Sequence, residues 1–210
     1  MNYLEIIGTI VGFVYLILEY KASFYLWIAG IIMPAIYIFV YYDAGLYADV
    51  AINIYYLFIA VYGYLLWTKG VIKKKIDKRR NVEKESNDIV VDEEKIKVLK
   101  ITHTPTKNWF LYGAIFLISF IIMGLILVNH TDSNVPWLDS FTTALSIVGM
   151  IMLAKKYVEQ WITWIVVDVV CCGLYIYKEL FFTSFLYGVY AIIAIFGYYK
   201  WKKMMNDEIE

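Results

Sequence analysis

Long apolar segments, separated by shorter polar ones, run along most of the chain. The longer ones reach the roughly 20 residues that a helix needs to cross the hydrocarbon core of a membrane. The pattern therefore predicts an all-α integral membrane protein with seven transmembrane helices. These helices are expected near residues 3–19, 23–42, 48–67, 109–128, 139–154, 160–177 and 181–200.

The apolar pattern occurs twice. Shifted forward by 134 positions without a gap, residues 3–69 fall on the C-terminal third, so that Trp27 meets Trp161 and Trp67 meets Trp201. An internal repeat in a membrane protein is typical of transporters built from two similar halves. We expect a first three-helix bundle over 3–67, a charged cytoplasmic loop over 68–108, a linker helix over 109–128 and a second bundle over 139–201. The single linker helix makes the two bundles parallel.

The basic residues predict the orientation in the membrane. If the helices alternate, 18 of the 19 Lys and Arg fall on one side, twelve of them between Lys69 and Lys107, and Lys178 falls on the other. Cytoplasmic loops collect Lys and Arg. We therefore expect a multi-pass protein of the inner (cytoplasmic) membrane, with the N-terminus outside and the C-terminus in the cytoplasm.

Composition agrees with this class and narrows the chemistry. The chain is 61% hydrophobic, against about 45–50% apolar residues in soluble domains. The formal net charge is zero, and no nucleic-acid partner is expected. Both His residues lie in predicted loops and no carboxylate cluster has ligand spacing, so neither a metal nor a cofactor is expected.

The sixth predicted helix carries the most informative face. Trp161, Trp164, Asp168 and Tyr175 recur at helical spacing. A carboxylate near the middle of a span costs about 2.5–3.5 kcal/mol even on mild insertion scales, which makes Asp168 a functional candidate by default. The alternative is a structural Asp that holds two helices in register. Indole faces attract cations and stack on flat rings, so this face suits a small aromatic cation.

The corresponding face of the second helix differs. Trp27 and Tyr37 are candidates for substrate contact, whereas Gly30 and Pro34 stand where the second half has Trp164 and Asp168. Proline in mid-span removes one backbone hydrogen bond and kinks a helix. Pro34 is therefore a hinge candidate, with a static bend as the alternative.

The third and seventh helices carry a further polar stripe. Asn53 and Tyr56 lie nearest the middle of the third helix, and Tyr187 and Tyr190 take their places on the seventh. All four are candidates for substrate contact. A hydrogen bond between helices, worth roughly 1 kcal/mol, is the competing interpretation of Asn53.

Several motifs in order resemble the PnuC family of vitamin transporters. They are Trp161-x-x-Trp164 with Asp168, Gly173-Leu174-Tyr175-x-Tyr177-Lys178, Gly45-Leu46-Tyr47-Ala48-Asp49, and Tyr62-Gly63-Tyr64-x-x-Trp67. The resemblance covers nearly all of the chain except the 70–107 loop. It implies the three-one-three architecture of SWEET sugar transporters and a homotrimer. It also implies that Trp161 and Trp164 belong to the binding site.

The resemblance further implies a function. Its best-known members import nicotinamide riboside by facilitated diffusion, and a cytosolic kinase traps the product. Family members that carry this substrate often have Gln where this chain has Asn53, which is one methylene shorter. Relatives are assigned to thiamine and to riboflavin, and thiamine is also a flat cation.

We therefore expect a facilitator of nicotinamide riboside uptake, working by alternating access with the substrate near the midplane. The chain has no Walker A motif for ATP hydrolysis and shows no nucleophile–base pair or metal constellation, so it is not expected to be an enzyme. The alternatives are a thiamine transporter of the same family and a membrane receptor or scaffold that does not transport.

Overall fold

The computed structural model describes residues 3–43, 47–84, 99–131 and 134–207, and most of these residues are helical. Gly45 and Leu46 of the motif at 45–49 lie outside the described residues. The seven helices are α1 (Tyr3–Tyr20), α2 (Tyr25–Asp43), α3 (Tyr47–Lys84), α4 (Thr106–His130), α5 (Pro136–Ala154), α6 (Gln160–Tyr177) and α7 (Phe181–Asp207).

Five of the described helical stretches are long and apolar enough to cross a membrane. They are Val50–Lys69 within α3, and α4, α5, α6 and α7. Two shorter apolar stretches, Val11–Tyr20 and Tyr25–Phe39, belong to α1 and α2. The prediction of an all-helical membrane protein is confirmed.

Helix α3 continues well beyond the predicted span. The charge pattern predicts a loop from residue 68, but α3 is helical to Lys84. The physical reason is helix propensity: residues 69–84 are rich in Lys, Arg and Ile and contain no proline. Charge identifies where an apolar span ends, and it does not by itself end a helix.

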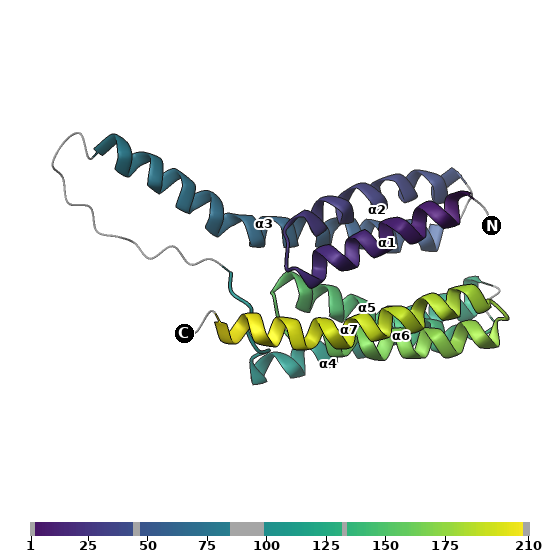
Figure 1. Cartoon of the computed structure of the whole chain (residues 1–210). Coiled ribbons are helices and arrows are strands. Elements are labelled where there is room, and N and C mark those ends of the chain that lie inside the picture. Colours follow the sequence, from purple (N-terminus) through teal and green to yellow (C-terminus); the bar gives the residue numbers. More distant parts are fainter. Residues whose placement is uncertain (1–2, 44–46, 85–98, 132–133, 208–210) are drawn as a thin grey trace. The chain divides into compact units, whose positions relative to one another are not determined.

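The chain folds as two compact units, Met1–Lys100 and Ile101–Glu210. In the first unit, α1 packs on α2 and α2 packs on α3. In the second unit, each helix from α4 to α7 packs on the next one along the chain (Figure 1). The linker helix α4 is thus part of the second unit.

The sequence repeat extends to the turns between helices. Ala22, after α1, and Lys156, after α5, are 134 residues apart, and both have a positive φ, 48° and 55°. The backbone hydrogen bonds also correspond: Ala22 N–H donates to Glu19 O at 2.9 Å, and Lys156 N–H donates to Leu153 O at 2.9 Å. The two halves share backbone geometry as well as an apolar pattern.

Each unit contains the same arrangement of two tryptophans and a glycine. The rings of Trp27 and Trp67 meet edge to face at 5.5 Å, and those of Trp161 and Trp201 at 5.8 Å. A Cβ built on Gly197 would lie 2.7 Å from the Trp161 ring, and one on Gly63 would clash with Trp27. Glycine is needed at both positions because the indole occupies the space of a side chain.

The segment before α4 is tied to the α5–α6 turn. Thr102 forms a parallel bridge with Tyr157, and the Glu159 carboxylate accepts hydrogen bonds from the Thr104 backbone N–H and hydroxyl, both at 2.8 Å. His103 Nδ1 contacts the other carboxylate oxygen. Partial burial raises the pKa of Glu159, but the hydrogen bonds from His103 and Thr104 outweigh it and leave this pKa below its ordinary value.

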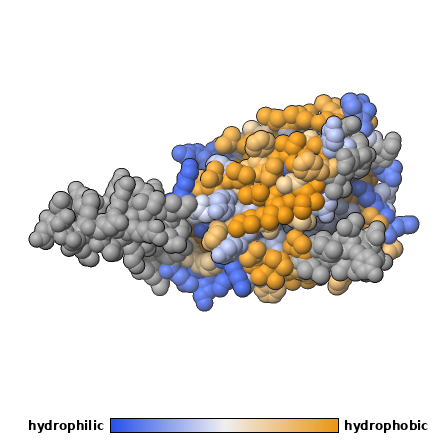
Figure 2. Space-filling view, turned by 90° about the horizontal axis from the view of Figure 1, so that it is seen from above, coloured by the Kyte–Doolittle hydropathy of each residue, from blue (hydrophilic) through white to orange (hydrophobic). Residues whose placement is uncertain are grey.

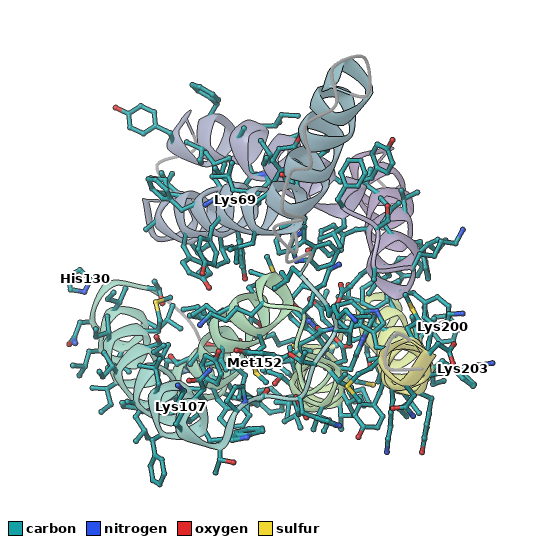
Figure 3. All side chains as sticks on the ribbon, turned by 90° about the vertical axis from the view of Figure 1, so that its left-hand side faces the viewer. Lys69, Lys107, His130, Met152, Lys200 and Lys203 are labelled. Carbon is teal, nitrogen blue, oxygen red and sulfur yellow. The ribbon has the colours of Figure 1, made fainter. Side chains whose placement is uncertain are left out.

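The surfaces of the helices are largely apolar, as lipid contact requires. Figure 2 shows hydrophobic residues over much of the coloured surface, with the most hydrophilic residues near its edges. On α4 the exposed apolar side chains include Phe110, Ile118 and Leu125. Figure 3 shows the exposed side chains of Lys107, Lys200 and Lys203, whereas Met152, labelled in the same view, is buried.

Candidate substrate site

Trp164 of α6 lies against a glycine of the neighbouring helix. A Cβ on Gly149 of α5 would lie 3.4 Å from Trp164 Cε2, so the indole packs directly over the α5 backbone. The indole Nε1–H is buried and has no hydrogen-bond partner among the described residues. A buried donor without a partner is costly, which makes this indole N–H a candidate for hydrogen bonding to a ligand.

Asp168 follows Trp164 by one helical turn and faces aromatic residues of α7. The residue is 7% exposed, and its carboxylate interacts electrostatically with Tyr187 and Tyr190. Within the described part of the chain, this carboxylate accepts no hydrogen bond and forms no ion pair. The described contacts thus include no hydrogen bond by which Asp168 would hold two helices in register, and its contact with a substrate stays a prediction.

The aromatic residues of α7 form a wall beside this carboxylate. The Tyr187 ring stacks on Tyr175 of α6 at 5.2 Å and meets the Tyr190 ring edge to face at 5.8 Å. Farther along, Ser184 Oγ donates to the Cys172 carbonyl at 2.9 Å and ties α7 to α6. These contacts bring together three predicted site residues of the second unit, Asp168, Tyr187 and Tyr190.

Trp161 occupies a different environment from Trp164. It is fully buried between Gly197 and Trp201 of α7, as Trp27 is between Gly63 and Trp67 in the first unit. Through this packing, Trp161 sets the distance between α6 and α7, and Trp27 sets the distance between α2 and α3. Their contact with a substrate stays a prediction.

The first unit fills the corresponding space with a residue from another helix. Gly30 of α2 takes the place of Trp164, and a Cβ on Gly30 would lie 3.7 Å from Tyr15 of α1. Tyr15 is the repeat partner of Gly149, so the large and small residues have exchanged helices. Tyr15 was not among the predicted site residues, although the 134-residue offset pairs Tyr15 with Gly149 and Gly30 with Trp164.

The other candidates of the first unit lie on α2 and α3. Asn53, Tyr37 and Tyr56 are partly buried, and the Tyr56 hydroxyl interacts electrostatically with Tyr15. Pro34 is buried and lies inside α2, which is helical on both sides of it. The substrate contacts of these residues and the hinge role of Pro34 stay predictions.

A second buried carboxylate was not foreseen. Glu19, near the end of α1, is 2% exposed and lies one turn after Tyr15, whereas the repeat has Leu153 at its position. The available signal was an acidic residue inside an apolar helix. No group of His, Cys, Asp and Glu able to hold a metal ion occurs within the described residues.

These features define a class of protein: a polytopic helical membrane protein with an internal repeat and a candidate aromatic–carboxylate site within its second unit. Comparison with known proteins then gives the family. The chain belongs to the nicotinamide mononucleotide transporter family, whose model matches residues 2–203. It is a multi-pass membrane transporter, a class distinct from enzymes.

Individual relatives are distant in sequence and match over different shares of the chain. The nicotinamide riboside transporter PnuC of Escherichia coli is 20% identical over 204 residues, which are 96% of this chain and 85% of the relative. The riboflavin/roseoflavin transporter RibM of Streptomyces davaonensis is 32% identical over 66 residues, 31% of each chain.

A solved structure has the same fold. The crystal structure of the vitamin B3 transporter PnuC matches 95% of this chain and 80% of its own, with a TM-score of 0.62 and 20% identity. At this identity the match is evidence for the fold alone.

Proposed function

We propose that this protein carries nicotinamide riboside across the membrane by facilitated diffusion. The observation that carries the proposal is the pair of Trp164 and Asp168, one turn apart and without hydrogen-bond partners in the described structure. An indole and a carboxylate together attract a flat organic cation. The pyridinium of nicotinamide riboside is such a cation, and E. coli PnuC is named for this substrate.

The riboside fits this site better than the mononucleotide in the family's description. A phosphate dianion would lie close to Asp168, which carries a negative charge when ionised, and like charges repel strongly where water is scarce. Neither α6 nor the part of α7 before Lys200 contains Lys or Arg to compensate. Phosphorylation by a cytosolic kinase would then create a product that this site does not carry back.

The seven helices are proposed to form two parallel three-helix bundles joined by α4, the three-one-three arrangement. Support comes from the matching turns at Ala22 and Lys156 and from the linker helix between the repeats.

The N-terminus is assigned to the outside and the C-terminus to the cytoplasm of the inner membrane, because 18 of 19 basic residues then face inward. A homotrimer is proposed on the family resemblance.

The positive charge of Lys178, the basic residue on the outer side, is neutralised by a nearby carboxylate. Its Nζ lies 3.0 Å from the Asp139 carboxylate at the start of α5. An ion pair reduces the bias that this single charge would exert on orientation. A reporter at the C-terminus tests the assignment, since activity outside the cytoplasm would contradict it.

Binding of purified protein to four compounds tests the proposed substrate. Calorimetric titration with nicotinamide riboside, its mononucleotide, thiamine and riboflavin is expected to give the highest affinity for the riboside. Thiamine is the main competitor because it is also a flat cation, whereas riboflavin is neutral and larger. Tighter binding of thiamine would reassign the substrate, and tighter binding of the mononucleotide would refute the charge argument.

A further inference from the structure

Gln160, the first residue of α6, is a buried polar residue whose side-chain amide finds no partner among the described residues. It is fully buried, and neither Nε2 nor Oε1 has a hydrogen bond within the described chain. Each unmet polar group costs free energy, because water no longer solvates it. A buried Gln with two unmet atoms is therefore an expensive choice for a packing residue.

The internal repeat shows that this position does not need a polar side chain. The partner of Gln160 is Leu26, also fully buried, in a turn whose backbone bonds correspond. Leu26 N–H donates to Ser23 O at 3.2 Å, and Gln160 N–H donates to Tyr157 O at 3.2 Å. The fold accepts leucine here, so the amide in the second unit serves something other than packing.

The amide lies on the same face of α6 as the proposed site. Residues 160, 164 and 168 are four apart, and such residues lie one above another on a helix. At 1.5 Å per residue, Gln160 lies about 6 Å from Trp164 and about 12 Å from Asp168 along the axis. This face of α6 thus carries, in order, the amide of Gln160, the indole of Trp164 and the carboxylate of Asp168. Each of these groups lacks a hydrogen-bond partner in the described chain.

We propose that Gln160 is a specificity-determining residue that pairs with the carboxamide of the substrate. A side-chain amide offers a donor and an acceptor side by side, and a carboxamide offers the complementary pair. The ligand's flat cationic ring then lies at Trp164 and its ribose hydroxyls reach Asp168. The assignment rests on the proposed function and adds the group that distinguishes nicotinamide from a plain pyridinium ring.

The test compares two ligands and two variants. Purified parent protein, Gln160→Leu and Gln160→Met are titrated with nicotinamide riboside and with its analogue that lacks the carboxamide. The parent is expected to bind nicotinamide riboside roughly five- to tenfold more tightly than the analogue, the usual effect of one or two buried neutral hydrogen bonds. Both variants are expected to bind the two ligands equally weakly, with unfolding temperatures equal to or above that of the parent.

Ser140→Ala is the matched control. Ser140 is also fully buried in the second unit, but its hydroxyl already donates to the Pro136 carbonyl at 2.6 Å, so ligand preference is expected to stay that of the parent. A variant that keeps the parent's preference for the carboxamide overturns the assignment of Gln160. So does a parent protein that binds both ligands equally, a result that requires no variant to fold. A parent that binds neither ligand overturns the proposed function instead.

Discussion

At the scale of single residues, the two tryptophans of the Trp-x-x-Trp motif lie in different surroundings. Trp161 is enclosed between Gly197 and Trp201, an arrangement that the first unit reproduces with Trp27. Trp164 has no such repeat partner, because Gly30 takes its place. We attribute helix spacing to Trp161 and ligand contact to Trp164.

Replacing each tryptophan with alanine separates these roles. Trp164→Ala is expected to weaken binding of nicotinamide riboside at least tenfold, because a desolvated cation–π contact contributes up to about 2 kcal/mol. Trp161→Ala is expected to lower stability by about 3–5 kcal/mol, the usual cost of removing a large core aromatic. Calorimetry and thermal unfolding measure the two effects, with the exposed Trp109→Ala on α4 as control. Unchanged affinity in Trp164→Ala would refute the assignment of this residue.

The charge of Asp168 gives a second test at this scale. Asp168→Asn is expected to weaken binding of the cationic riboside more than binding of a neutral analogue of the same shape, since only the cation gains from the carboxylate charge. Asp139→Asn, which alters a carboxylate paired with Lys178, is the control. Equal losses for cation and neutral analogue in Asp168→Asn would indicate a structural role.

At the scale of helices, close packing depends on a few glycines. Gly197→Ala is expected to lower the free energy of unfolding by about 1–3 kcal/mol, because the new Cβ would lie 2.7 Å from Trp161 and force repacking. Gly173→Ala on α6 is the matched control: among the described residues, no atom outside its chain neighbours and its own helix backbone lies within 4 Å of the added Cβ, and alanine favours the helix. If both substitutions change the unfolding temperature equally, the Trp161–Gly197 contact does not position α7.

The contacts between the segment before α4 and Glu159, called the tether below, make stability depend on pH. The pKa of Glu159 is below its ordinary value of about 4.3, so its hydrogen bonds to His103 and Thr104 stabilise the fold fully above that value. This stability is lost as pH falls through the lowered pKa. Thermal unfolding between pH 3 and 7 is expected to show a steeper acid loss in the parent than in Glu159→Gln. Parallel curves would contradict this role of Glu159.

At the scale of the whole molecule, the sequence predicts the helices well and their contacts poorly. Helices that cross a membrane need long apolar runs, and such runs are easy to recognise in a sequence. The predicted and observed bounds of α6, for example, agree at 160–177. The extension of α3 was not predicted because the charged composition of residues 69–84 is also typical of a solvated loop. The exchange of Tyr15 and Trp164 between helices involves a different helix in each repeat, so the pattern along a single helix face does not predict it. The tether joins residues 56 apart in sequence, His103 and Glu159, and no periodicity predicts such a pair.

The central claim is that this chain is a carrier for nicotinamide riboside that needs no energy source. Counterflow of labelled nicotinamide riboside in proteoliposomes tests it most directly. Exchange is expected in the parent protein without ATP or an imposed ion gradient, with a strong loss of exchange in Trp164→Ala. Absence of exchange for nicotinamide riboside, with the protein folded and correctly inserted, would contradict it.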